Sequence, residues 1–176
     1  SIVVKRDATL RHHVATFGGE IVRITPRLAF EAPGGDAELT GVYFADAGQY
    51  IENRLLVDHA VPNCRSNVLY KGALQGDKAS RLPEARTCWV GDVLIRAEAK
   101  GTDTYETNRN LVLTDGARAD AIPNLEIETG EIAGAGHAAT VGRFDDDQLF
   151  YLRSRGIREE DATRLIIRGF FNEVLN

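Results

Sequence analysis

Residues 134–157 read GAGHAATVGRFDDDQLFYLRSRGI, and the character of the chain changes within this stretch. Before Gly142 the sequence consists of short apolar runs separated by turn residues, which is typical of β-strands. From Asp145 onward the apolar residues recur at helical spacing. The sequence therefore predicts a β region over residues 1–142 and a C-terminal helical domain over residues 143–176.

Between Ile2 and Ile132 the apolar runs are short, often alternate with polar residues, and are rich in Val, Ile, Leu and Thr. Such runs predict strands, and they occupy residues 20–24, 39–44, 53–57, 89–95, 110–113 and 124–127. Glycine, asparagine and aspartate residues break the runs. This spacing fits a sandwich, a barrel or a β-solenoid, and no strict hexapeptide or nonapeptide period chooses among them.

Two helices are predicted after the β region. Asp145 is placed as the N-cap of a helix over residues 148–155, and Gly156 as the residue that ends it. A second helix is predicted over residues 158–175, with its main apolar positions at Ala162, Leu165, Ile166, Phe170 and Val174, while Ile167 and Phe171 widen that face. One interpretation is a helix that caps the end of a β core, and the other is a helix that also meets a partner protein.

Composition excludes several functions. A formal net charge of −5 argues against nucleic acid as a partner, because phosphate binding requires a basic face. The sequence has no apolar stretch of 18 residues and no signal-peptide pattern, and its two cysteines are interpreted as reduced thiols, so we expect a cytoplasmic protein. It also lacks a phosphate-binding P-loop and the common hydrolase motifs, so we predict no catalytic residues and no ATP hydrolysis by this chain.

Three features could bind metal. His137 is surrounded by glycine and alanine, which leaves its imidazole uncovered, and neutral imidazole is a competent iron ligand. A single histidine cannot hold a cluster, so other ligands would come from another chain. Asp58, His59 and Cys64 could bind a transition metal, but a buried structural role in a tight turn is the preferred interpretation. The acidic run 145–147 is interpreted as helix N-terminal charge.

Several separated motifs resemble those of the SufB/SufD family of iron–sulfur cluster assembly scaffolds, and the SufD branch in particular. They are G-G-x-x-x-R at residues 18–23, the block from Gln49 to Gly72 that ends in Y-K-G, N-x-N-L at 108–111, P-x-L-E-I at 123–127, and the run from His137 through L-F-Y-L-R-S-R-G-I. Their shared order across nearly the whole chain makes the resemblance specific. SufB-like chains carry a cysteine in the segment corresponding to residues 108–110 and a glutamate after the aligned histidine. Here that segment has no cysteine and Ala138 follows, which favours SufD. Many SufD chains carry a cysteine two residues before the histidine, where this chain has Ala135.

The resemblance implies a right-handed parallel β-helix followed by a small helical domain, and we expect the chain to be the C-terminal portion of a longer protein. It implies a non-catalytic scaffold that pairs with a SufB-like paralogue through the C-terminal ends of the two β-helices and builds a transient iron–sulfur cluster there. His137 would be an interfacial ligand for iron or the cluster, and no tightly bound cofactor is expected in the isolated chain. The helical ending would dock a SufC-like ABC ATPase through residues that include Leu149, Tyr151, Arg153, Arg155, Gly156, Ile166, Phe170 and Phe171.

Two alternatives stay open on the sequence alone. One is a structural β-solenoid interaction module in which His137 packs without binding metal. The other is a carbohydrate-active β-helix enzyme, which would need paired carboxylates on one rung, whereas the dense acidic run lies beyond the β region. Exposed strand edges at the end of a β-helix also make a homodimer possible.

Overall fold

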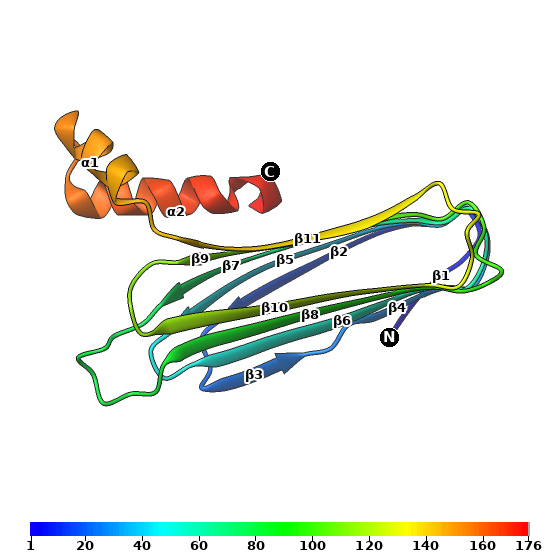
Figure 1. Ribbon diagram of the computed structural model, residues 1–176, viewed down its shortest axis with the longest axis horizontal. Coiled ribbons are helices and arrows are strands. Elements are labelled where there is room, and N and C mark those ends of the chain that lie inside the picture. Colours follow the sequence, from blue (N-terminus) through cyan, green and yellow to red (C-terminus); the bar gives the residue numbers. More distant parts are fainter. Residues whose placement is uncertain (176) are drawn as a thin grey trace.

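The computed structural model describes residues 1–175 and shows eleven strands followed by two helices in that part of the chain (Figure 1). The strands are β1 (Ile2–Val4), β2 (Thr9–Phe17), β3 (Ile21–Ile24), β4 (Arg27–Phe30), β5 (Asp36–Asp46), β6 (Tyr50–His59), β7 (Arg65–Gln75), β8 (Ala85–Ile95), β9 (Asp103–Val112), β10 (Ala117–Ile127) and β11 (Gly134–Arg143). The helices are α1 (Asp146–Ser154) and α2 (Glu159–Leu175). The predicted apolar runs lie in or at the ends of these strands, so the mainly β prediction is confirmed.

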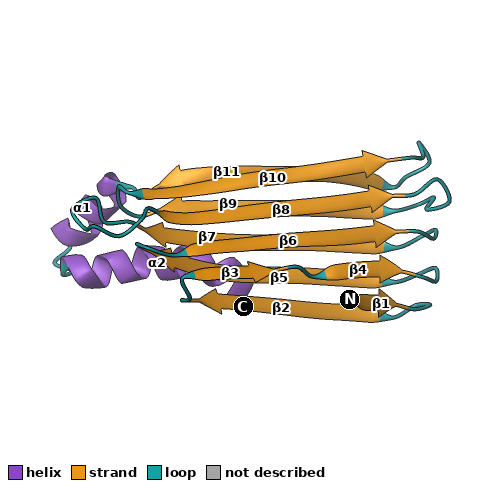
Figure 2. Ribbon diagram, turned by 90° about the horizontal axis from the view of Figure 1, so that it is seen from below, coloured by secondary structure: helices purple, strands orange, loops and turns teal. Residues whose placement is uncertain are grey.

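The strands form two sheets that face each other. One has the order β1-β4-β6-β8-β10, with β3 also paired to β6, and the other has the order β2-β5-β7-β9-β11. All the strand pairs are parallel, and from β4 onward successive strands alternate between the two sheets. Figure 2 shows the resulting stack of rungs, in which the chain advances by one level on each circuit. We call β1–β11 the coil; this β-helix-like parallel architecture agrees with the expected fold, and its right-handedness stays a prediction.

Large side chains from both sheets fill the interior of the coil, and the motif Tyr70-Lys71-Gly72 shows how they fit. Tyr70 is fully buried inside, whereas Lys71 points to the outer face of β7. A Cβ atom on Gly72 would lie 2.0 Å from the ring of Tyr43, and one on Gly41 would lie 2.3 Å from the ring of Tyr70. The two glycines therefore leave the space that the two buried tyrosine rings occupy.

The helix boundaries agree closely with those expected from the sequence. Asp145 caps α1, because its Oδ1 accepts hydrogen bonds from the backbone N–H groups of Asp147 at 2.9 Å and Gln148 at 3.3 Å. Gly156 has a φ of +84°, the left-handed conformation that commonly ends a helix. The acidic run 145–147 is thus accounted for by the cap and the first turn of α1.

Helix α2 lies across the outer face of the sheet that contains β5 and β7, rather than capping the end of the coil (Figure 1). Its buried side chain there is Phe171, which packs with Val42 and Ala73 and is flanked by Ile167, Phe170 and Val174. The predicted apolar face is therefore partly wrong, since Leu165 is half-exposed. The reason is that the first half of α2 packs against α1 and only its second half reaches the sheet.

Lys71 fastens α2 to the coil. Its ammonium group is almost fully buried, donates to the backbone carbonyl of Phe170 at 2.8 Å, and forms an ion pair with Glu173 at 2.7 Å. It also lies 5.2 Å from the centre of the Phe170 ring. The predicted domain boundary at residues 142 and 143 falls beside the end of β11, and the division into two domains stays a prediction. Neither helix in the described part of the chain could cross a membrane.

Candidate functional site

His137 lies in β11, which with β10 forms the last rung of the coil. Within residues 1–175, β11 pairs only with β9 and β10 only with β8, so this rung has one uncovered side. The register places His137 beside Glu106 of β9, an inward-facing position. Its side chain still keeps 43% of its surface exposed, because no further rung covers it. The histidine thus stands at the open mouth of the coil interior.

Glu106 lies one rung below His137 and is buried, with only 1% of its side chain exposed. Its Oε1 is 3.9 Å from Nδ1 of His137, too far for a hydrogen bond. Its Oε2 reaches across the interior toward β8, since a Cβ atom on Gly91 would lie 2.3 Å from it. Burial, with a smaller effect from Asp92, raises the pKa of Glu106 to about 8.

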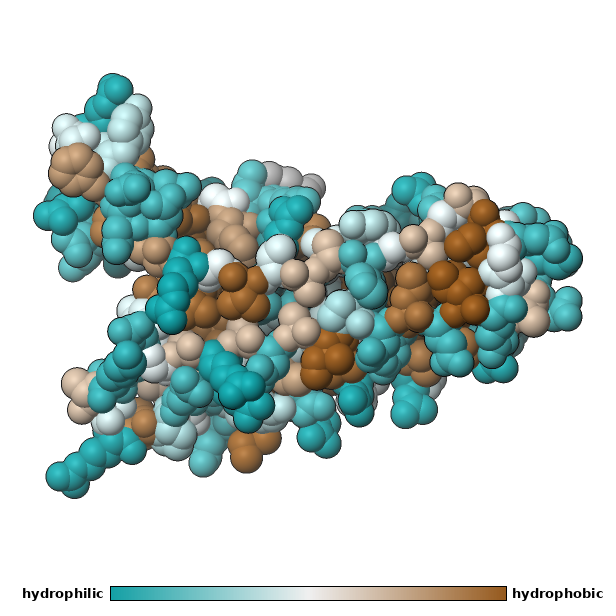
Figure 3. All heavy atoms as spheres, in the orientation of Figure 1, coloured by the Kyte–Doolittle hydropathy of each residue, from teal (hydrophilic) through white to brown (hydrophobic). Residues whose placement is uncertain are grey.

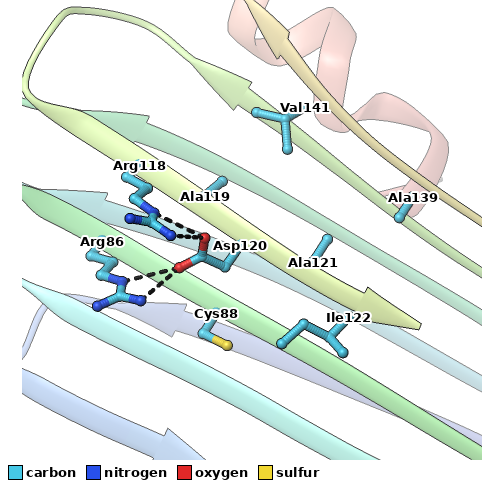
Figure 4. Close-up of a pocket in the computed structure, with 9 residues that line it drawn as sticks. All are labelled: Arg86, Cys88, Arg118, Ala119, Asp120, Ala121, Ile122, Ala139 and Val141. Atoms are coloured by element: carbon cyan, nitrogen blue, oxygen red, sulfur yellow. Dashed lines mark hydrogen bonds and ion pairs between the residues drawn. The ribbon is translucent and has the colours of Figure 1, made fainter. Parts of the chain in front are cut away.

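An open pocket of about 540 Å³ straddles the edge of the last rung (Figure 4). Small side chains line one side of it, namely Ala119, Ala121, Ala139 and Val141. On its other side Asp120 accepts hydrogen bonds from Arg86 at 2.8 Å and Arg118 at 2.9 Å, and Figure 4 shows both guanidinium groups converging on that carboxylate. The alanines keep the end of the interior accessible.

Cys88 also lines this pocket, on the opposite face of β8 from buried Trp89. Burial raises the pKa of its thiol, which disfavours the thiolate form that binds metal. Within the described residues, no three His, Cys, Asp or Glu side chains are grouped closely enough to hold a metal ion. Any metal bound at the last rung would therefore need ligands from elsewhere.

The second candidate, Asp58, His59 and Cys64, is structural, as preferred from the sequence. His59 is buried, its ring stacks on Phe30 with centroids 4.6 Å apart, and its Nε2 lies 2.9 Å from the hydroxyl oxygen of Ser66. Asp58 is instead held by Arg96 through two hydrogen bonds of 2.8 Å. The three side chains do not converge on one point.

Asn108 and Asn110 form a hydrogen-bond network inside the coil. Asn110 donates from Nδ2 to Oδ1 of Asn108 at 2.7 Å, and Asn108 donates to the hydroxyl of Tyr43 at 2.9 Å and to the carbonyl of Tyr70 at 3.1 Å. The hydroxyl of Tyr43 donates in turn to Oδ1 of Asn110 at 2.7 Å. The N-x-N-L motif therefore supports the rung below β11 through amides that satisfy one another.

The helical end, α1 and α2 together, presents the other candidate surface. Figure 3 shows it standing out from the strands, with apolar atoms among its polar ones. Tyr151 is exposed, and its ring lies 5.1 Å below the guanidinium of Arg155, while Arg153 pairs with Glu159 at 3.1 Å. A groove of about 400 Å³ between the helices is lined by Asp147, Gln148, Tyr151, Leu152 and Ile166.

Two predicted partner-binding residues have internal roles. Phe171 is buried against the coil, and Phe170 supplies the carbonyl and the ring that contact Lys71. They hold α2 in place and leave the exposed surface to other residues. Phe150, next to Tyr151 in α1, is among the most exposed large apolar residues of the described chain, with 74% of its surface accessible.

Known proteins match this chain over almost its full length. The family model for the SufBD core domain of the SUF system for FeS cluster assembly matches residues 1–170. The chain belongs to the SufBD family. A SufBD family protein of Mycobacterium tuberculosis is 69% identical over 98% of this chain and 43% of its own length. The iron–sulfur cluster assembly protein SufD of Escherichia coli is 31% identical over 98% of this chain and 39% of its own length. A SufBD family protein of Mycobacterium leprae is 27% identical over 97% of this chain and 19% of its own length.

SufBD membership confirms the resemblance seen in the sequence motifs, including the expectation that the chain corresponds to one portion of a longer protein. The chain spans less than half the length of these relatives. The matched family is described as one of FeS cluster assembly, which disfavours the carbohydrate-active alternative.

Sequence reasoning singled out His137 as a candidate ligand, which stays a prediction, and it did not single out Glu106 or Lys71. Glu106 occurs in the run Asp103–Asn110, where every residue except Tyr105 is polar or charged, and its inward orientation follows only from the pairing of β9 with β7 and β11. Lys71 was seen in the Y-K-G motif, but its role depends on contact with α2, a hundred residues away.

Proposed function

We propose that this chain is part of a non-catalytic scaffold subunit that pairs with a SufB-like paralogue and assembles a transient iron–sulfur cluster at their interface in the cytoplasm. The observation that carries the proposal is the position of His137, which faces inward on the last rung and yet is accessible from the open end of the coil. A ligand in that position can be shared with a second chain that covers the end.

The last rung supports such pairing in two ways. The outer edges of β10 and β11 have no strand partner within residues 1–175, so their backbone groups are available to a strand from another chain. Partly exposed apolar side chains lie on the same rung, including Ile122, Ile127 and Val141. A SufB-like subunit could add strands here, and a second copy of this chain is the homodimeric alternative.

His137 fits iron as cargo. Neutral imidazole is a ligand for iron, and the small neighbours of His137 leave room for partner side chains. This chain supplies no thiolate on the last rung, where the residue two positions before the histidine is Ala135. Thiolate ligands would therefore come from the paralogue.

The second part of the proposal is that the helical end docks a SufC-like ABC ATPase. Exposed aromatic and arginine side chains are enriched at protein interfaces, and α1 presents Phe150, Tyr151 and Arg155 beside the interhelical groove. Leu149, Arg153, Gly156 and Ile166 belong to the same surface. The sequence lacks a P-loop, so the ATPase activity would reside in the partner.

Co-expression of the full-length protein with its paralogue and ATPase, followed by anaerobic purification, tests both parts. We expect His137→Ala to lower the iron and acid-labile sulfide of the complex severalfold without changing its subunit composition. His13→Ala, a histidine replacement in β2 at the opposite end of the coil, is the matched control. Full cluster content in His137→Ala would refute the ligand role.

The docking part has its own test in the same complex. We expect the pair Phe150→Ala and Tyr151→Ala to release the ATPase while the paralogue stays bound, because truncating exposed aromatic anchors removes interface contacts. Arg168→Ala, on the exposed side of α2, is the control. Unchanged ATPase retention in the double variant, or in a deletion of residues 145–176, would refute docking at the helical end.

A further inference from the structure

Glu106 is the polar interior residue of β9 that the fold does not satisfy. Along the inward face of this strand, Thr104 lies 2.6 Å from the hydroxyl of Ser66, and Asn108 and Asn110 bond each other and Tyr43. Neither carboxylate oxygen of Glu106 has a hydrogen-bond partner among the described residues. A buried carboxyl group without a partner is costly, so its presence at this one position calls for a ligand.

The geometry indicates which direction that ligand occupies. The carboxylate is closed off on the side of β8, where Gly91 and the ring of Trp89 crowd the interior. Its other oxygen faces His137, the last inward side chain before the open end. A ligand can therefore reach the carboxylate of Glu106 only from the open end of the coil, past the imidazole of His137.

The spacing of the two groups suits one metal ion better than a direct contact. A hydrogen bond between them would need a separation near 3 Å, whereas Oε1 and Nδ1 are 3.9 Å apart. Bonds from a transition metal to a carboxylate oxygen and to an imidazole nitrogen are each roughly 2.1 Å long, as in zinc sites. Their sum, about 4.2 Å, exceeds the observed separation, so a single ion can touch both atoms without movement of the backbone.

We propose that Glu106 is a second metal ligand supplied by this chain, so that Glu106 and His137 together form a two-residue half-site for ferrous iron at the mouth of the coil. Carboxylate and imidazole together are a ligand set suited to iron(II), and the remaining coordination positions face the open end, where a second subunit would cover them. This inference rests on the proposed function, in which His137 already serves as an interfacial ligand. It adds an oxygen ligand from inside the coil. The two-residue half-site would then be complete before the partner contributes any ligand.

The test is binding of ferrous iron alone to the full-length protein, measured by anaerobic titration calorimetry and by the shift in melting temperature that iron produces. Glu106→Gln keeps the shape of the side chain and replaces the carboxyl group with an amide, which is a much weaker iron ligand. We expect it to weaken iron binding at least about tenfold and to abolish most of the melting-temperature shift. Glu126→Gln, an exposed carboxylate on β10, is the matched control and should bind as the wild type does.

The outcomes separate the two claims. Weak binding in both Glu106→Gln and His137→Ala, with normal binding in Glu126→Gln, supports the half-site. Wild-type affinity in Glu106→Gln together with loss in His137→Ala overturns the role of Glu106 and leaves the proposed function standing. Wild-type affinity in both variants, or no iron binding by the wild type, overturns the half-site, and cluster content in the complex then decides whether His137 acts with the partner alone. A melting curve without iron shows that each variant is folded.

Discussion

Removal of Glu173 should loosen α2 more than removal of Lys71, although the two residues form one ion pair. Lys71 is 4% exposed and Glu173 is half-exposed, so the two charges differ in their access to water. If Lys71 is replaced by methionine, Glu173 stays hydrated and keeps its contact with Arg109 at 3.1 Å. If Glu173 is replaced by alanine, a buried ammonium group keeps only the carbonyl and the ring of Phe170.

The magnitudes follow from this asymmetry. Lys71→Met loses a charged hydrogen bond and a half-exposed ion pair, for which about 1.5 kcal/mol is expected. Leaving a buried charge without its partner costs about 3–5 kcal/mol when no other group contacts that charge. The contacts of Lys71 to Phe170 place Glu173→Ala near the lower limit, at about 3 kcal/mol. The double variant should be less destabilised than Glu173→Ala, because it leaves no buried charge behind.

Native-state hydrogen exchange measures this locally, since α2 can open without unfolding of the coil. We expect amide protection in α2 to fall about tenfold in Lys71→Met and roughly a hundredfold in Glu173→Ala, with protection in β7 unchanged. Arg168→Ala is the exposed control on the same helix. A milder effect from Glu173→Ala than from Lys71→Met, or a double variant at least as exchange-labile as Glu173→Ala, would refute the reasoning.

Three further perturbations have defined outcomes. Burial lowers the pKa of His59 from 6.5 to about 4, so the stability that its neutral form contributes is present above pH 6.5 and is lost as the pH falls toward 4. In urea denaturation the wild type should lose about 2 kcal/mol more than His59→Gln between pH 7 and pH 5. Parallel pH profiles for the two proteins would contradict this. Gly72→Ala forces a methyl group against the ring of Tyr43 and should lower the free energy of unfolding by about 1–3 kcal/mol, whereas an unchanged urea midpoint would contradict the packing argument. Asp145→Ala removes the N-cap of α1 and should destabilise that helix by about 1 kcal/mol, seen as faster amide exchange in α1 alone; equal exchange would show that the cap contributes nothing.

The sequence predicted well what is decided locally. The N-cap at Asp145, the helix end at Gly156 and most strand positions follow from short-range preferences for capping, left-handed backbone and alternating burial. The coil itself could not be derived from those preferences, because the pairing of strands some thirty residues apart depends on the lengths of the turns. Family resemblance supplied that information.

The strand β9 shows why the candidate site was only half predicted. Its inward residues include Thr104, Glu106, Asn108 and Asn110, while Tyr105 and Leu111 face outward. Alternation alone would place the tyrosine and the leucine inside, the reverse of the observed orientation. The inward face of β9 is polar because its asparagines belong to a hydrogen-bond network inside the coil. That network joins β5, β7 and β9, so it cannot be predicted from the sequence of β9 alone.

The strand that carries the proposed metal ligand His137 leads directly into α1, which carries part of the proposed docking surface. The backbone ladder continues from β11 to Phe144, whose N–H donates to the carbonyl of Val112 at 2.9 Å, and α1 begins two residues later. Helix α2 is tied separately to β7 by Lys71. Under the proposed function, a partner that displaces α1 would therefore pull on β11, the edge strand that carries His137. The contacts of Lys71 would at the same time hold α2 against the inner rungs. Substitutions at Lys71, which weaken the attachment of α2, and substitutions that remove contacts on α1 should therefore have different effects on cluster assembly, although both lie in the same helical end.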